Sequence, residues 1–125
     1  MKLGIVGSRR RAKVEDLQIL RKRIRQLQPK IDMIISGGCP TGADAFAEQI
    51  AREIGILIII YHPKLDNLRT YTRQQVIEAM HARNFLIATH SDHLIALAAP
   101  DRKGGTENTI GYFKNTHQEE ALEIL

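Results

Sequence analysis

The sequence has very little cysteine and few aromatic residues, and each shortage argues against a class of protein. Cys39 is the single cysteine, so no intramolecular disulfide can form and we expect a reducing, cytoplasmic setting. Tryptophan is absent, and three tyrosines with three phenylalanines leave little ring surface on which nucleic-acid bases could stack. A disulfide-stabilised secreted module and an aromatic platform for single strands are therefore both disfavoured.

Long apolar runs are missing as well. No stretch approaches the ~20 residues that a helix needs to cross a bilayer. The first residues lead directly into a strand pattern and lack the architecture of a signal peptide. We therefore expect no membrane partner.

Two glycine motifs of common nucleotide enzymes are also absent. The first apolar run ends in Gly4-x-x-Gly7 rather than G-x-G-x-x-G, and no G-x-x-x-x-G-K-[ST] occurs. Ordinary NAD-dependent oxidoreduction and P-loop hydrolysis are therefore disfavoured. His90 and His93 match no established metal-ligand spacing, so we predict neither a metal site nor a cofactor.

The composition is that of one ordinary globular domain. The chain has 125 residues, of which 43% are hydrophobic and 26% charged. Its net charge is +4, and the excess of basic residues gathers at 9–13 and 21–25. This excess favours anionic partners such as nucleotides or nucleic acid, although the second cluster fits a solvent-exposed helix face better. We expect residues 1–125 to form a single domain.

Short apolar runs alternate with segments of helical periodicity. The pattern predicts strands over 2–8, 33–36, 56–61, 93–99 and 121–125, and helices over 14–28, 41–54, 73–90 and 107–115. The run 56–61 is continuously apolar, which is typical of a strand buried on both faces. Such alternation indicates an α/β protein, a Rossmann-like three-layer α/β/α sandwich with a five-stranded parallel sheet in the order 3-2-1-4-5.

Glycine-bearing turns follow three of the strands. In a parallel sheet of this kind the turns after the strands meet at one edge, where ligands bind. The central turn, Ser36 to Asp44, precedes a helix whose N–H groups and dipole suit an anion, and Thr41 with Asp44 resembles a capping box. Any one turn could be no more than a turn, but together they predict a site for a phosphate-bearing ligand. Its candidate residues are Gly7, Ser8, Arg9, Gly37, Gly38, Thr41, Gly42, Asp44, Gly104, Gly105 and Thr106.

The helix over 73–90 contains a conflict. Arg83 and Asn84 fall in the same angular sector as its apolar stripe, and an arginine buried without a partner is expensive. Arg83 could extend to solvent or pair with a carboxylate. The alternative, which we favour, is that Arg83 and Asn84 reach the ligand and hold a phosphate or a ribose.

Other polar segments have weaker signals. Glu107 follows Thr106 at the start of a helix, so it could serve only the helix dipole, or it could activate water or contact a sugar hydroxyl. We favour the first role. The loop 62–72 is long for a connection and is a candidate lid or ligand loop. Asp92 is interpreted as a turn or cap residue, and Cys39 as structural.

Five separated motifs together resemble those of the SLOG superfamily, in the same order along the chain. They are Gly4 to Arg9 (GIVGSR), Ser36 to Asp44 (SGGCPTGAD), Arg83-Asn84, Asp92, and Gly104 to Thr106. Over roughly residues 2–113 the chain is most similar to the small YspA-like members. The superfamily also contains the LOG phosphoribohydrolases and the DNA-processing protein A.

This resemblance implies a Rossmann-like, often homodimeric, nucleotide-binding protein. By position, residues 7–9 would form the first ligand loop and Gly37, Gly38, Gly42 and Asp44 the second. Arg83 and Asn84 would line the pocket, and residues 104–106 would bind phosphate. The phosphoribohydrolases carry a glutamate three residues after the threonine of P-G-G-x-G-T-x-x-E, whereas this chain has Thr109 there.

Three functions follow from these observations. The first is a binding module or sensor for a nucleotide or nucleotide-derived small molecule. The second is hydrolysis of the N-glycosidic bond of a nucleoside monophosphate, with Glu107 and Arg83 stabilising an oxocarbenium-like state. The third is a nucleic-acid-binding protein related to the DNA-processing protein A, which the basic charge favours.

Overall fold

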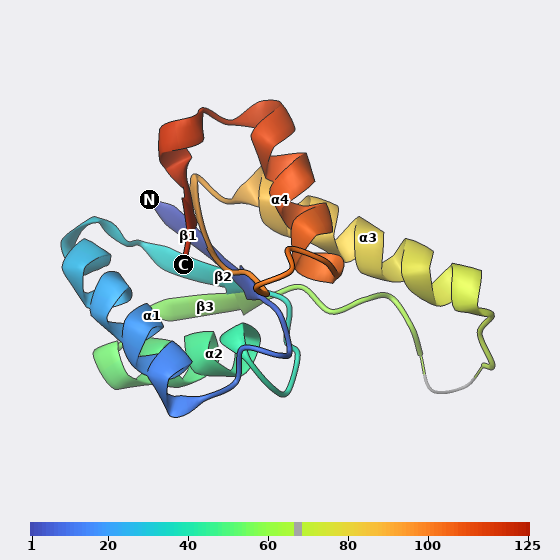
Figure 1. The fold of residues 1–125 in the computed structure, drawn as a ribbon, viewed down its shortest axis with the longest axis horizontal. Helices are drawn as coiled ribbons and strands as arrows, with labels where there is room; N and C mark the ends of the chain where they lie inside the picture. The colour runs from blue at the N-terminus through green and yellow to red at the C-terminus, as the bar shows by residue number, and fades with distance from the viewer. Residues whose placement is uncertain (67–68) are drawn as a thin grey trace.

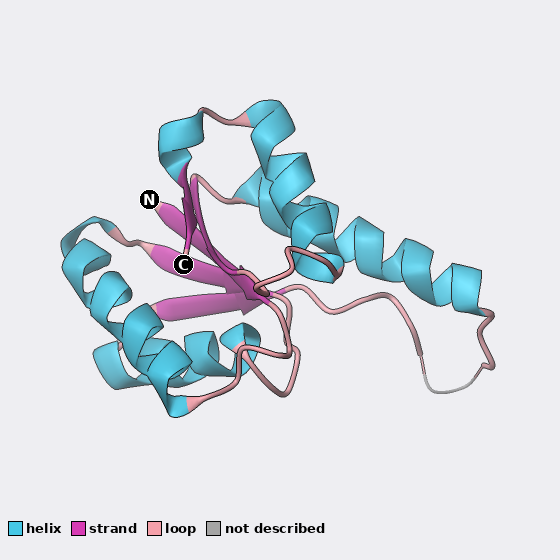
Figure 2. Cartoon of the chain, in the orientation of Figure 1, coloured by secondary structure: helices cyan, strands magenta, loops and turns pink. Residues whose placement is uncertain are grey.

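The computed structural model describes residues 1–66 and 69–125, which form a parallel β-sheet with helices on both faces (Figure 1). The five strands have the order β3-β2-β1-β4-β5, so the expected fold class and strand order are confirmed. Figure 2 shows the strands as one central layer between two groups of helices. The elements are β1 (Lys2–Gly7), α1 (Val14–Leu27), β2 (Met33–Ser36), α2 (Ala43–Ile54), β3 (Leu57–Ile60), α3 (Arg73–His90), β4 (His93–Leu97), α4 (Gly105–Thr116) and β5 (Leu122–Ile124).

Strand β1 is the centre of the sheet. It pairs in parallel with β2 and β4, so that Gly4 lies opposite both Ile35 and Leu94. Because side chains alternate along a strand, β1 serves two cores. Leu3 and Ile5 enter one core, and Val6 enters the other.

The two cores lie on opposite faces of the sheet. The first includes Leu20 and Ile24 of α1 together with the buried face of α2. The second includes Ile87 of α3 with Ile110 and Phe113 of α4. Burial of these apolar faces is the main favourable term of folding.

Several expected ends of elements are corrected: α2 begins at Ala43 rather than at residue 41, and β4 ends at Leu97 rather than at residue 99. The strand expected over 56–61 is the shorter β3 at an edge of the sheet, and Leu57 is 61% exposed. No residue of β3 is buried, so its apolar run is not buried on both faces. Helix α4 begins at Gly105 rather than at residue 107, with Gly104 as its N-cap.

Helix α3 is the longest helix and projects beyond the sheet at its N-terminal end (Figure 1). It begins with a capping box in which Thr72 accepts a hydrogen bond from the Gln75 backbone and the Gln75 side chain accepts from the Thr72 backbone. Across the described ranges, no helix combines the length and apolar character that crossing a membrane requires.

The last strand is tied to α1 and β4 by polar contacts of Glu123. Glu123 of β5 accepts hydrogen bonds from Arg23 of α1 at 2.5 and 3.0 Å and lies 2.6 Å from Nε2 of His93. Partial burial acts to raise the pKa of Glu123, but the hydrogen bonds from Arg23 and His93 outweigh it and hold this pKa below its usual value. Arg11 adds a hydrogen bond from its guanidinium to the backbone oxygen of Leu125.

This network predicts an acid-sensitive contribution to stability. A depressed pKa in the folded state means that the contribution is complete above the unfolded value of about 4.3 and is lost as pH falls through the lower folded value. We expect Glu123→Gln to lower the free energy of unfolding by about 1 kcal/mol at pH 7, with a smaller difference from wild type at pH 3. Urea unfolding at the two pH values measures this.

The exposed Glu120 provides the control. Glu120→Gln should change stability little at either pH. If Glu123→Gln lowered the free energy of unfolding equally at pH 7 and pH 3, the ionic origin of the effect would be contradicted.

Candidate functional site

A cavity of about 470 Å³ opens at the carboxyl ends of β1, β2 and β4. This volume is in the range that small-molecule sites occupy. Ten of the candidate residues line it: Gly7, Ser8, Arg9, Gly37, Asp44, Arg83, Asn84, Gly104, Gly105 and Thr106. The other four, Gly38, Thr41, Gly42 and Glu107, are not part of its lining.

Arg83 is the half-buried cation of this cavity. Its Nη1 donates to the backbone oxygen of Gly37 at 2.6 Å, and its Nε donates to Oδ1 of Asn84 at 2.9 Å. Within the described part of the chain, Arg83 forms no ion pair. Burial lowers the pKa of Arg83, nearby Asp44 and Cys39 act to raise it, and Arg9 lowers it further. An arginine keeps its charge in proteins, so a positive charge is held at the cavity without a bonded counter-ion.

The absence of a side chain at Gly37 makes this position of Arg83 possible. A Cβ atom at Gly37 would lie 2.6 Å from Nη1 of Arg83 and 3.1 Å from Oδ2 of Asp44. The guanidinium therefore rests directly on the backbone that follows β2.

Asp44 closes the turn between β2 and α2. Its carboxylate accepts hydrogen bonds from Oγ of Ser36 at 2.9 Å and from the backbone N–H of Cys39 at 3.0 Å. The N-cap of α2 is Gly42 with φ 77°, and no side chain caps the helix. The expected capping box of Thr41 and Asp44 is therefore wrong. The chain's own carboxylate thus binds a backbone N–H of the turn that precedes α2, the turn expected to hold the anion.

Asn84 joins α3 to the start of α4. Its Nδ2 donates to Oδ1 of Asn108 at 3.0 Å and to the backbone oxygen of Gly105 at 3.4 Å, while its Oδ1 accepts from Arg83. Asn84 is buried. All of its polar atoms thus have protein partners, and it orients both Arg83 and the first turn of α4.

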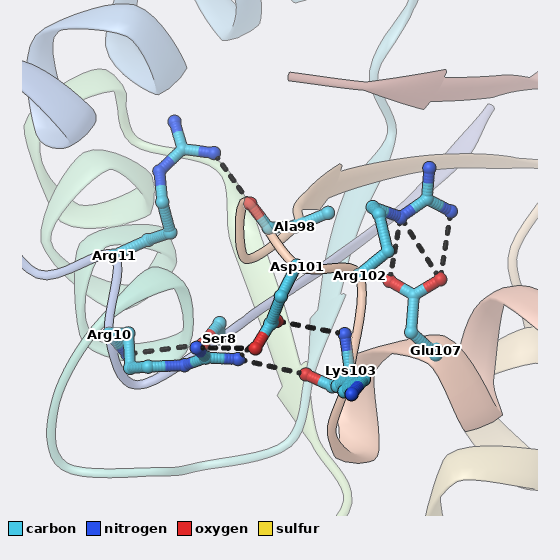
Figure 3. Close-up of polar contacts among 8 residues, drawn as sticks. All are labelled: Ser8, Arg10, Arg11, Ala98, Asp101, Arg102, Lys103 and Glu107. Atoms are coloured by element: carbon cyan, nitrogen blue, oxygen red, sulfur yellow. Dashed lines mark hydrogen bonds and ion pairs between the residues drawn. The ribbon is translucent and has the colours of Figure 1, made fainter.

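A clasp between two loops shapes the mouth of the cavity (Figure 3). The guanidinium of Arg10 donates to both carboxylate oxygens of Asp101, at 2.9 and 2.6 Å, and to the backbone oxygen of Lys103 at 3.2 Å. The loop after β1 is thereby joined to the loop after β4. Both loops contribute exposed cations to the cavity lining, Arg9 and Lys103.

Glu107 lies beside this mouth but faces another residue (Figure 3). Its carboxylate accepts hydrogen bonds from Nε and Nη2 of Arg102 at 2.8 to 3.0 Å. Arg102 has φ 55°, the one positive φ at a non-glycine residue in the described segments. Glu107 is thus held by an ion pair and is not part of the cavity lining. This position in the first turn of α4 is compatible with the favoured role, in which its charge interacts with the helix dipole.

Several cavity residues escaped the sequence prediction. Val76, Ile77 and Met80 belong to the apolar stripe of α3, and at the end of α3 that projects beyond the sheet this stripe lines the cavity (Figure 1). Thr109 also lines it, one turn after Thr106 on the same face of α4. Helical spacing from Thr106 was the signal that could have identified Thr109.

The described part of the 62–72 loop contributes no residue to the cavity lining. Residues 67–68 of this candidate lid lie outside the described residues.

Comparison with solved structures supports the fold. The molybdenum cofactor binding protein from the phototrophic bacterium Rippkaea orientalis matches with a TM-score of 0.71 and 20% sequence identity, over 98% of this chain and 74% of that chain. No family model matches the sequence, and no curated protein matches it. At this identity the likeness shows the α/β fold alone.

The contact at Gly37 gives a direct prediction. Gly37→Ala should leave the protein folded, because the new methyl group meets the far end of a flexible side chain, but it should displace Arg83 from the Gly37 carbonyl. We expect the free energy of unfolding to fall by about 1 kcal/mol, measured by urea unfolding, with a moved Arg83 in a crystal structure.

Gly111→Ala is the matched control. No atom lies within 4 Å of a Cβ placed at this helical glycine, so alanine should stabilise the protein by up to about 1 kcal/mol. A Gly37→Ala variant with wild-type stability and an unmoved Arg83 would show that the close approach is not required.

Proposed function

We propose that this protein binds a phosphate-bearing small molecule, a nucleotide or nucleotide-derived compound, in the cavity at the carboxyl edge of the sheet. The observation that carries the proposal is Arg83, a half-buried cation held over Gly37 with no ion pair among the described residues. A planar guanidinium with free donors recognises phosphate or carboxylate oxygens well.

The charges around Arg83 support an anionic ligand. Arg9 and Lys103 stand at the mouth, and the clasp between Arg10 and Asp101 keeps their two loops together. Helix α4 begins at the same place, with Gly104 as an N-cap that offers no side-chain partner to the first N–H groups. Free N–H groups at a helix start attract phosphate.

The comparisons support a small-molecule site in a fold of this shape. The structural neighbour from Rippkaea orientalis is described as a cofactor-binding protein. The order of the sequence motifs resembles that of the SLOG superfamily, and this resemblance is the reason for proposing a nucleotide as the small molecule. Membership of that superfamily and a homodimeric state are further parts of the proposal and rest on this resemblance alone. A cytoplasmic location is also proposed, and it rests on the single cysteine.

We propose binding rather than hydrolysis because the carboxylates near the site are engaged. Glu107 is paired with Arg102, and Asp44 accepts from Ser36 and Cys39. A general acid or base must reach the reacting atoms. A binding module or sensor needs only the cations and N–H groups that line the cavity.

Titration calorimetry tests the proposal. The probes are AMP, GMP, CMP, UMP, ADP-ribose and a short single-stranded DNA. We expect at least one of the small molecules to bind. Arg83→Ala should lower the affinity for this molecule ten- to 100-fold, which is the effect of losing a charged hydrogen bond. The ligand should also raise the melting temperature, because it binds the folded state.

Arg25→Ala is the matched control, since Arg25 is an exposed arginine of α1, the helix that covers the other face of the sheet. It should leave the affinity unchanged. Binding of the DNA alone, steeply salt-dependent and weakened by Arg25→Ala but not by Arg83→Ala, would replace the proposal with the nucleic-acid function.

A further inference from the structure

Two threonines of α4 face the cavity with hydroxyl groups that have no protein partner. Thr106 and Thr109 are 9% and 1% exposed, and both line the cavity. Neither hydroxyl forms a hydrogen bond with any described residue. By contrast, Thr116 of the same helix and Thr89 of α3 donate back to carbonyls of the preceding turn. The two cavity threonines therefore lack the partner that helical threonines of this protein otherwise find.

The burial of Thr109 shows where its hydroxyl points. Among the described residues, no fully buried side-chain oxygen or nitrogen lacks a hydrogen-bond partner. Because the Thr109 hydroxyl has no partner, it must reach a surface, and the residue is only 1% exposed. The surface it reaches is that of the cavity, whose lining includes Thr109. The rest of the side chain is packed in the protein.

The surroundings of the two threonines differ in charge. Thr106 follows the exposed Gly104 and Gly105 at the mouth, near Lys103 and Arg9. Thr109 shares the buried part of the lining with Val6 and Ile87, which are 6% and 1% exposed. The cavity thus has exposed cations at its mouth and a mostly apolar floor, where the Thr109 hydroxyl lacks a partner among the described residues and the polar atoms of Asn84 are all bonded within the protein.

We propose that Thr109 determines the orientation and specificity of the ligand by hydrogen-bonding an uncharged polar atom of its body, a sugar hydroxyl or a base atom, at the cavity floor. This inference rests on the proposed function. A phosphate at the floor would be desolvated between Val6 and Ile87, away from the exposed Arg9 and Lys103, which is unfavourable. The phosphate therefore remains at the mouth with Arg9, Arg83 and the start of α4. The uncharged end of the ligand lies deeper in the cavity, at the floor.

Two substitutions and two probes test this assignment. Thr109→Val removes the hydroxyl and keeps the shape, and Thr109→Ser keeps the hydroxyl. The probes are inorganic phosphate and whichever of AMP, GMP, CMP and UMP binds most tightly. We expect the nucleotide to bind at least tenfold more tightly than phosphate. Thr109→Val should lower the affinity for the nucleotide about tenfold, because a polar atom of the ligand is left without its partner, and should leave the affinity for phosphate unchanged.

Thr109→Ser should retain at least half of the nucleotide affinity, since the hydroxyl is present. Thr109→Val should fold as well as wild type, because it removes only an unpartnered polar group, and its melting temperature checks this. A purely structural role of Thr109 would change the affinities for the two probes together.

The outcomes separate this inference from the proposed function. Nucleotides that bind no more tightly than phosphate, equal weakening of both probes, or no change in Thr109→Val would overturn the role of Thr109 and leave the binding site in place. Failure of phosphate, the four nucleoside monophosphates and ADP-ribose all to bind would overturn the proposed function and the inference with it.

Discussion

The parallel pairing of β1 with both β2 and β4 is the constraint on which the site depends. In this register the three strands end at the same edge, and the turns that follow them must share one space. The register of β1 is fixed by the burial of its side chains, because Leu3 and Ile5 enter one core while Val6 enters the other. A register shift by one residue would exchange these faces. The apolar cores on both faces therefore position the loops that line the cavity.

Within that frame, electrostatics set the character of the cavity. Arg83 is brought there by a helix that extends past the sheet, and it is held by Gly37 and Asn84 through neutral acceptors. Glu107 pairs with Arg102 and Asp101 pairs with Arg10. Asp44 has only neutral hydrogen-bond partners, so among the described residues it is the one carboxylate of the lining that faces the charges of Arg9, Arg83 and Lys103. The cations that line the cavity therefore exceed the acids available to neutralise them, which suits an anionic ligand.

The sequence was sufficient for the architecture because hydrophobic periodicity and glycine turns are local signals. The alternation of apolar runs and helices predicts the strand order, and the turns after β1, β2 and β4 predict where the cavity opens. Side-chain partners were harder to predict. Asp44 has the spacing of a cap to Thr41 but bonds Ser36 and Cys39 instead, since the turn folds back on its carboxylate.

Two further features of the site also depend on contacts between residues that no local sequence pattern shows. The sequence gives no indication of a partner for Glu107, whereas in the structure Arg102 adopts a positive φ and pairs with it. The stripe of Val76, Ile77 and Met80 has the periodicity of a core face, but that end of α3 projects beyond the sheet (Figure 1), and these residues line the cavity. Periodicity shows which face of a helix is apolar and does not show what covers it.

The measurement that tests the central claim most directly is an NMR titration with the tightest-binding nucleoside monophosphate, following backbone amides and the Nε–Hε signal of Arg83. The account predicts that the largest shifts occur at Arg83, Gly37 and residues 104–109, around one cavity. Shifts concentrated on the exposed face of α1, at Lys22 and Arg25, with an unchanged Arg83 signal, would contradict it.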